Sequence, residues 1–225
     1  MAETNAENTG NATTPRERYR AQVREEIKKH AWEQIATAGA SALSLNAIAK
    51  QMGLSGPALY RYFANRDQLI TELVRDAYRS LADAFLASAR ADGDLADLAH
   101  ALRRWALDDP QRYLLVYGTP VPGYQAPEDT TGIAGEIMAV LLDACTAAGA
   151  TTDDERLDER LDAHLAEHSA WAGDHPAPPS ALRHALTVWT RLHGVLSLEL
   201  AGHFTGMGFD PALLYAAETA TLTGR

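Results

Sequence analysis

The sequence predicts an all-α protein. Alanine is abundant, apolar residues recur at spacings of three and four, and segments with the alternating pattern of strands are nearly absent. Hydrophobic residues make up 46% of the 225-residue chain and charged residues 22%. This composition is enough to build a packed helical core.

The chain opens with a polar segment, residues 1–15, rich in Asn, Thr, Ala and Glu. It lacks the basic start and the apolar stretch of a secretory signal, so we expect a disordered tail. The first helix is expected over residues 16–37, because Pro15 suits a helix start and Gly39 a helix stop. Its inward-facing stripe is expected to be Tyr19, Val23, Ile27, Ala31 and Ile35.

Three helices are expected next, at short intervals. Ser44 caps a helix over residues 45–52, and Gly53 ends it. Ser55 caps a third helix over residues 56–62, with a proline in its first turn, where a missing N–H costs nothing. A long fourth helix follows over residues 66–89.

The second half of the chain continues the helical pattern. The expected helices cover residues 95–107, 110–117, 128–148, 154–168, 181–204 and 211–221. The stretch 118–123 is rich in Gly and Pro and is expected to be a loop. The helix over 181–204 is apolar around most of its circumference. It therefore needs cover on more than one side, which a second subunit best explains.

Charge is divided unevenly along the chain, although the net charge is −10. Residues 16–66 hold nine Lys or Arg against four Asp or Glu, whereas residues 67–225 hold 11 against 24. The basic part can gain from counterion release on a phosphate backbone. The acidic part repels such a backbone, so contact with nucleic acid is expected at one end only.

The most informative stretch is residues 43–73, LSLNAIAKQMGLSGPALYRYFANRDQLITEL. It predicts a short helix, a tight turn at Gly53 and a second short helix, with Ile48, Leu59 and Phe63 among the residues that face inward. A helix-turn-helix presents its second helix to a major groove in this way.

This stretch resembles the tetracycline-repressor (TetR) family over about residues 16–75, and the run SGPALYRYFANRDQLI is highly specific. The resemblance implies a three-helix helix-turn-helix DNA-binding domain over residues 16–64. A long helix joins it to a helical ligand-binding and dimerisation domain over residues 65–225. It also implies that residues 58–62 form the recognition helix. Such a protein is expected to be a ligand-responsive repressor that binds a palindromic double-stranded operator as a homodimer.

The resemblance also assigns roles around the recognition helix. Residues matching Ser44, Tyr60 and Arg66 hold phosphates, and those matching Ser55, Gly56, Pro57 and Arg61 lie near bases or backbone. Many relatives carry Lys or Arg where this chain has Gly56. The expected DNA-binding residues are Arg16, Arg18, Ser44, Leu45, Asn46, Ser55, Gly56, Pro57, Ala58, Tyr60, Arg61, Tyr62 and Arg66.

Elementary chemistry agrees with these roles. Free N–H groups at Leu45 and Gly56 can face phosphates, and Arg61 can pair with guanine. The basic start of the first helix, with Arg16, Arg18 and Arg20, can reach phosphates or a minor groove. Packing of the module is the alternative role for Tyr60 and Tyr62, and for Tyr62 it is the favoured one.

The second half carries Trp189 and His193 within a W-x-x-x-H-G pattern, which resembles one C-terminal subfamily of the same family. Aromatic rings with polar tips can line a cavity for a small molecule, an unidentified effector that we expect to be mostly apolar or aromatic. For each ring taken alone, ordinary core packing is the favoured alternative. The candidate ligand-binding residues are Trp105, Tyr113, Tyr117, Tyr124, Met138, Trp189 and His193.

Other classes of function find little support. No nucleophile elbow, phosphate loop or paired catalytic carboxylates are found, so neither an enzyme nor a cofactor is expected. His164, His168 and His175 suggest a zinc site only weakly, and a solvated polar segment is favoured over a metal. A helical interaction protein without DNA binding is the remaining alternative. The single Cys145 and the lack of a long apolar run favour a cytoplasmic protein without a membrane span.

Overall fold

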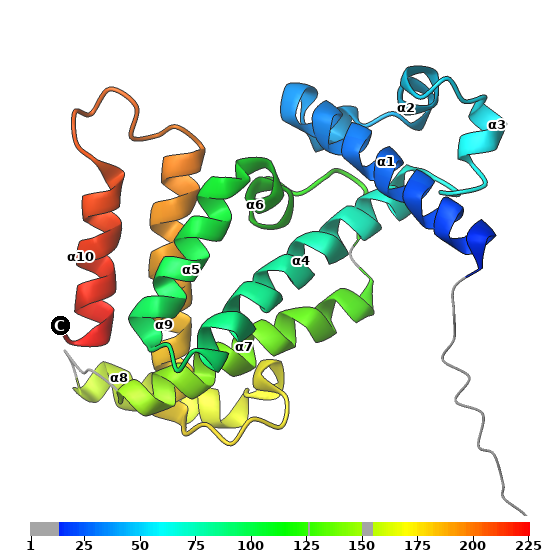
Figure 1. Cartoon of the computed structure of the whole chain (residues 1–225). Coiled ribbons are helices and arrows are strands. Elements are labelled where there is room, and N and C mark those ends of the chain that lie inside the picture. Colours follow the sequence, from blue (N-terminus) through cyan, green and yellow to red (C-terminus); the bar gives the residue numbers. More distant parts are fainter. Residues whose placement is uncertain (1–13, 126, 150–154) are drawn as a thin grey trace, which may run out of the picture. The chain divides into compact units, whose positions relative to one another are not determined.

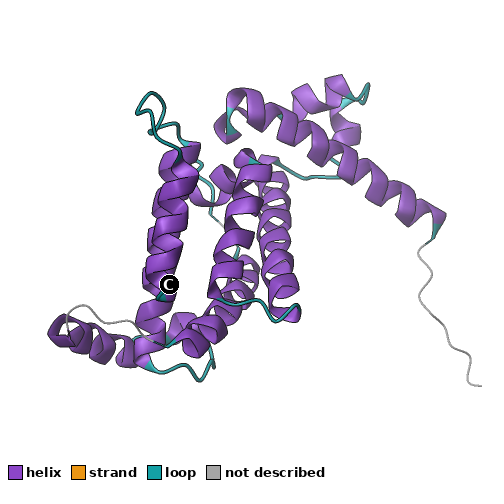
Figure 2. Cartoon of the chain, turned by 60° about the vertical axis from the view of Figure 1, so that its left-hand side comes forward, coloured by secondary structure: helices purple, strands orange, loops and turns teal. Residues whose placement is uncertain are grey.

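The computed structural model describes residues 14–125, 127–149 and 155–225. Within these ranges the chain forms ten α-helices and two short 3-10 turns, with no strand, which confirms the all-α prediction (Figures 1 and 2). Most of the expected tail, residues 1–13, lies outside the described residues. Two compact units meet at Ile70 and Thr71, inside the fourth helix. The limits expected for the domains, 16–64 and 65–225, remain predictions.

The first unit opens with α1 (Pro15–Ala38), which begins at a capping box. The Thr14 hydroxyl accepts from the backbone N–H of Glu17, and the Glu17 carboxylate accepts from the backbone N–H of Thr14. The expected inward stripe is buried from Val23 onward. Tyr19 is 65% exposed, so its expected inward position was wrong, because the core of this unit begins only at Val23.

The helix-turn-helix consists of α2 (Leu45–Gln51) and α3 (Gly56–Leu59), and a 3-10 turn, η1 (Ala40–Ala42), precedes it. The hydroxyls of Ser44 and Ser55 accept from backbone N–H groups at the two helix starts, as expected. Gly53 adopts a φ of 66° in the turn. The third helix is shorter than expected, because it ends at Leu59 and turns follow through residue 62.

The second unit contains the rest of the helices, and α4 runs into it from the first unit. Their bounds are α4 (Arg66–Arg90), α5 (Leu95–Asp108), α6 (Pro110–Tyr117), α7 (Glu128–Ala148), α8 (Glu155–Glu167), α9 (Pro179–Leu200) and α10 (Pro211–Thr223). Helix α9 ends four residues before the expected 204, because the chain turns through Gly202, whose φ is 79°.

Helix α9 is the central element of this unit. It packs against α5, α6, α7, α8 and α10, and its inward face includes Val188, Leu192 and Leu196. Helix α8 is tied to α9 by Arg183, which is 7% exposed and reaches the carboxylates of Asp158 and Asp162 at 3.0 and 2.8 Å. The core of the second unit is therefore arranged around one face of this central helix.

One segment of α7, Thr130–Ala148, is long and apolar enough to cross a membrane, judged by length and composition alone. Its mean hydropathy is 1.4 and 22% of it is buried. Core helices of water-soluble proteins meet the same criterion, and Ile137, Leu141 and Leu142 of α7 belong to the hydrophobic core here. The absence of a membrane partner stays a prediction.

Candidate nucleic-acid interface and buried aromatic cluster

The turn that follows α3 carries two exposed side chains capable of contacting nucleic acid. Tyr60 is 46% exposed, and Arg61 is exposed with no side-chain hydrogen bond or ion pair to the described residues. Their placement follows from the sequence, because Leu59 and Phe63 on either side are fully buried and fix the turn to the core. The Tyr60 hydroxyl and the Arg61 guanidinium are therefore available to contact a phosphate or a base.

The other residues expected at this interface divide by exposure. Arg16, Arg18, Asn46, Ser55 and Pro57 are exposed, whereas Ser44, Gly56, Ala58, Tyr62 and Arg66 are half-buried. Leu45 is only 5% exposed, so its side chain belongs to the core and only its backbone is available to a partner. The ring of Tyr62 lies beneath the Arg20 guanidinium, 5.7 Å from ring centroid to Cζ.

Arg66 has an intramolecular role besides any contact it makes with DNA. Its Nη2 donates to the carbonyl oxygen of Ala40 at 2.8 Å, and Nη1 lies 3.8 Å from the Asp67 carboxylate. The side chain thereby ties the start of α4 to η1.

Sequence reasoning missed Gln34, whose side-chain oxygen accepts from the backbone N–H of Ser44 at 3.0 Å. This bond joins α1 to the residue that caps α2. No sequence signal singles out one glutamine for this task, because the contact spans ten residues and depends on how the helices cross.

In the second unit, five of the seven candidate ligand residues form one buried aromatic cluster: Trp105, Tyr113, Tyr117, Trp189 and His193. The imidazole of His193 lies at its centre, with ring centroids 4.2 Å from Trp189, 4.4 Å from Tyr117 and 5.5 Å from Tyr113. The spacing of Trp189 and His193 on α9 predicted that they share a face.

The polar atoms of this cluster are incompletely paired. The Tyr113 hydroxyl lies 2.9 Å from Nδ1 of His193 and 2.8 Å from the Ser197 hydroxyl. By contrast, Nε2 of His193 and the Tyr117 hydroxyl are inaccessible to water and have no hydrogen-bond partner among the described residues. Burial lowers the pKa of His193 to about 4 and raises the pKa of Tyr117. Both groups are therefore neutral near pH 7.

The remaining two candidates lie outside the cluster. The Tyr124 hydroxyl lies 3.2 Å from that of Thr71 on α4. Met138 on α7 is half-buried against the core. A small apolar cavity of about 10 Å³ adjoins the cluster and is lined partly by Trp189, Phe85 and Leu192.

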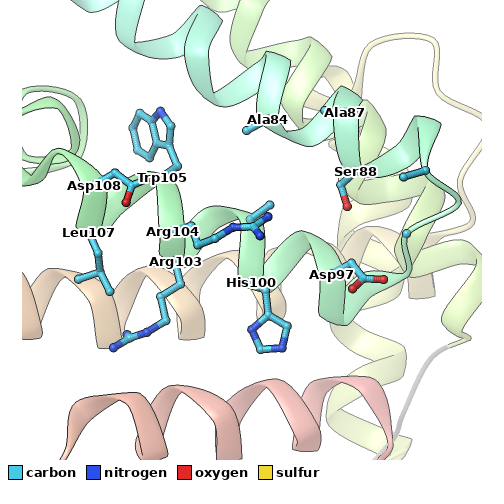
Figure 3. Close-up of a pocket in the computed structure, with 13 residues that line it drawn as sticks. Ala84, Ala87, Ser88, Asp97, His100, Arg103, Arg104, Trp105, Leu107 and Asp108 are labelled. Carbon is cyan, nitrogen blue, oxygen red and sulfur yellow. The ribbon is translucent and has the colours of Figure 1, made fainter.

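A larger concavity is an open groove of about 1090 Å³ between α4 and α5 (Figure 3). Small side chains of α4, including Ala84 and Ala87, line one side, and His100, Arg104 and Asp108 of α5 line the other. Its charged lining residues on α5 are Asp97, Arg103, Arg104 and Asp108, two of each sign, so the groove favours neither anions nor cations.

The three histidines weighed as zinc ligands do not come together at one point. The rings of His164 and His168 stack with centroids 4.1 Å apart, and His175 instead lies 3.0 Å from the Asp143 carboxylate. The part of the chain that is described contains no group of three His, Cys, Asp or Glu arranged to hold a metal ion.

Family models match both units. Residues 27–73 match the bacterial regulatory proteins of the tetR family, and residues 95–222 match the tetracyclin repressor-like C-terminal domain. The chain belongs to the TetR family. The assignment of the W-x-x-x-H-G pattern to one subfamily stays a prediction.

Relatives agree with this assignment over most of the chain. The HTH-type transcriptional regulators Mb1846 of Mycobacterium bovis and Rv1816 of Mycobacterium tuberculosis are 34% identical over 215 residues, covering 90% of this chain and 92% of each relative. The crystal structure of the regulatory protein SCO4313 is 69% identical and superposes with a TM-score of 0.86, covering 94% of this chain and all of that one. A Rhodococcus sp. RHA1 protein at 20% identity and a TM-score of 0.61, covering 97% and 98%, shares the fold. This TetR protein is thus a DNA-binding transcriptional regulator and not an enzyme.

Proposed function

We propose that this TetR protein is a ligand-responsive repressor that binds a palindromic operator as a homodimer in the cytoplasm. The observation that supports DNA reading is the exposed pair Tyr60 and Arg61, which lies on a buried scaffold in the basic part of the chain. In this proposal Arg61 contacts base or phosphate, and Ser44, Tyr60 and Arg66 hold phosphates. The backbone N–H groups at Leu45 and Gly56 face phosphates as well.

The other proposed contacts surround these. Arg16 and Arg18 reach phosphates or an adjacent minor groove from the start of α1. The residues proposed to lie along the duplex are Asn46, Ser55, Pro57, Ala58 and Tyr62.

Dimerisation is supported by the exposed faces of α9 and α10. Leu198 is 45% exposed and Leu213 70%, and the small residues Gly194, Ala216 and Ala217 are exposed on the same two helices. Small and apolar side chains on adjacent exposed helices suit close packing against a second copy. A two-fold dimer also matches a two-fold operator.

The dimer is tested by the mass of the full chain in solution. Leu213→Glu is expected to shift the population from dimer to monomer, because it places a charge in the proposed interface. The matched variant Leu161→Glu, on the exposed surface of α8, is expected to leave the dimer intact. A Leu213→Glu protein that remains dimeric would rule out this face.

Response to an effector is supported by the two unpaired polar atoms in the aromatic cluster. Buried polar groups normally have partners, and each unpaired one costs about 1–3 kcal/mol. A mostly apolar or aromatic effector with one polar group would supply a partner to Nε2 of His193 and the Tyr117 hydroxyl. Because the adjoining cavity is only about 10 Å³, the rings must move apart to admit it. Trp105, Tyr113 and Trp189 would then surround its apolar part, with Tyr124 and Met138 at the edge.

The switch is tested with operator DNA selected by the chain itself from a random library. Compounds that induce a reporter under that operator are expected to lower the affinity of the purified chain for the duplex. Tyr117→Phe and His193→Phe are expected to weaken this response while DNA binding is kept, and His100→Gln on the exposed face of α5 serves as control. Unchanged operator affinity with every inducing compound would contradict the switch.

A further inference from the structure

Two arginines of α1 hold the backbone at the end of the proposed reading segment. Nη2 of Arg20 donates to the carbonyl oxygen of Arg61 at 3.0 Å. Nη1 of Arg24 donates to the carbonyl oxygen of Tyr62 at 2.5 Å. Arg20 and Arg24 are four residues apart on one helix, so they share a face and reach consecutive carbonyls.

Both guanidinium groups also stack on aromatic rings of the same segment. Cζ of Arg24 lies 4.2 Å from the centroid of Phe63, and Cζ of Arg20 lies 5.7 Å from that of Tyr62. Phe63 is fully buried, so Arg24 is fixed against the core, whereas Arg20 is exposed. Arginine suits this position because its planar group can stack and donate at the same time.

The reading segment needs such support. Helix α3 has only four residues, and a helix this short does not hold its conformation alone. Carbonyl groups near a helix C-terminus lack intrahelical partners, and basic side chains can supply them. Because Arg20 donates a hydrogen bond to the carbonyl oxygen of Arg61, the backbone that carries the exposed Arg61 side chain is fixed in position.

We infer that Arg20 and Arg24 are positioning residues for DNA reading: they fix the backbone of Arg61 and Tyr62 and do not themselves bind DNA. This inference rests on the proposed role of the segment 56–62. It assigns Arg20, which bonds to the backbone of Arg61, to a different task from Arg16 and Arg18, which precede it on α1.

Arg20 and Arg24 belong to a part of α1 that lies before the match to the family model. The match to the tetR family begins at residue 27, whereas α1 begins at Pro15, where the Thr14–Glu17 capping box starts the helix. The first turns of α1 are therefore a feature of this chain that the family match does not describe.

The competing role for these arginines is direct contact with phosphates, and the two roles differ measurably. A phosphate contact contributes to binding of any duplex, and its loss lowers the slope of log K against log salt by about 0.9. A positioning residue affects only the contacts that Arg61 and its neighbours make with the bases. Its loss therefore weakens binding to the selected sequence and not to unrelated DNA.

The experiment uses the full chain, the duplex that it enriches from a random-sequence library and a scrambled duplex of equal length. Arg20→Gln and Arg24→Gln are each expected to weaken binding to the selected duplex about tenfold, the size expected for a lost hydrogen bond to a charged group. Binding to the scrambled duplex is expected to stay within about twofold with an unchanged salt slope. Arg24→Lys, which can still donate to a carbonyl, is expected to recover most of the affinity.

Arg18→Gln provides the contrast, because a lost phosphate contact weakens both duplexes and lowers the salt slope. Thermal unfolding of each variant verifies folding, and the exposed Arg20 keeps the test valid if Arg24→Gln proves unstable. Equal losses on both duplexes for Arg20→Gln, or no loss on either, would overturn this inference but would leave the proposed reading role of the segment intact. If the wild-type chain enriched no sequence, the proposed reading role would fail, and the inference with it.

Discussion

Nδ1 of His193 lies 2.9 Å from the Tyr113 hydroxyl, and this bond holds a neutral imidazole inside the aromatic cluster. Burial lowers the pKa of His193 from 6.5 to about 4. Between these values the unfolded chain takes up a proton and the folded chain does not, so the folded state loses stability as the pH falls. Above about pH 6.5 the group has no further effect.

We predict that His193→Gln weakens the acid sensitivity of the chain. At about 1.4 kcal/mol per pH unit, the wild type should lose on the order of 2 kcal/mol of unfolding free energy through this group between pH 7 and pH 5. Urea unfolding at the two pH values measures the difference. The exposed His100→Gln variant should behave like the wild type. Equal pH dependence in His193→Gln and wild type would contradict the assignment.

A second prediction concerns the ion pair of Arg103 and Glu199, which joins α5 to α9. The two hydrogen bonds are 2.6 and 2.9 Å long, and the side chains are only 14% and 17% exposed. Arg103 also lies over the Tyr215 ring. Glu199→Gln is expected to lower the unfolding free energy by about 1–3 kcal/mol, because it leaves a poorly solvated but not completely desolvated guanidinium without its counterion.

The chain offers a matched control in Arg79 and Glu136, which form two similar bonds of 2.7 and 2.9 Å. Their side chains are 42% and 45% exposed, so solvent screens the pair. Double-mutant cycles on both pairs should give a coupling energy below about 1 kcal/mol for the exposed pair and a larger one for Arg103–Glu199. Equal couplings would show that burial does not decide the strength.

Arg183 supports a third prediction, on the attachment of α8. In the described part of α8, Leu165 is the buried apolar residue, so the ion pairs of Arg183 with Asp158 and Asp162 carry much of the docking. Arg183→Gln is expected to accelerate hydrogen exchange in α8 while that of α9 changes little. Arg191→Gln, at a more exposed ion pair of α9 with Glu218, should leave α8 protected. Unchanged exchange in α8 would refute this view.

The helices were predictable from sequence because their signals are local. Ser44 and Ser55 cap the helices that they were expected to cap, and the apolar stripe of α1 was placed correctly from Val23 to Ile35. The prediction for Tyr19 was wrong because periodicity shows which residues share a helix face but not where along the helix the core begins. The early end of α9 depends on the turn at Gly202.

The candidate sites were predictable in part for the same reason. Trp189 and His193 share a helix face by their spacing, whereas their meeting with Tyr117 of α6 depends on how separate helices pack. Arg20 and Gln34 act through backbone groups distant in sequence, and no motif marks such a contact. Local chemistry thus indicated which residues to consider, and tertiary packing decided which of them meet.

Two glycines of the helix-turn-helix provide a fourth prediction. Gly53 has a φ of 66°, which favours glycine, whereas an added Cβ at Gly56 would lie 3.6 Å from Oδ1 of Asn46, an ordinary contact. Gly53→Ala is expected to lower the unfolding free energy by about 1–2 kcal/mol, and Gly56→Ala to leave it unchanged or slightly raised. Chemical unfolding of the two variants compares them directly, and an equal loss in both would contradict the backbone argument.

The space beside Gly56 leads to a fifth prediction, on DNA binding. A side chain fits there, and the exposed Ser55 and Pro57 flank the position, so a lysine can extend outward. Gly56→Lys is expected to strengthen binding to any duplex and to steepen the slope of log K against log salt by about 0.9, the contribution of one added phosphate contact. Fluorescence anisotropy with labelled duplex across a salt series measures the slope. Gly56→Gln, of similar length but uncharged, should leave it unchanged, and an unaltered slope for Gly56→Lys would mean that this position does not face the phosphates.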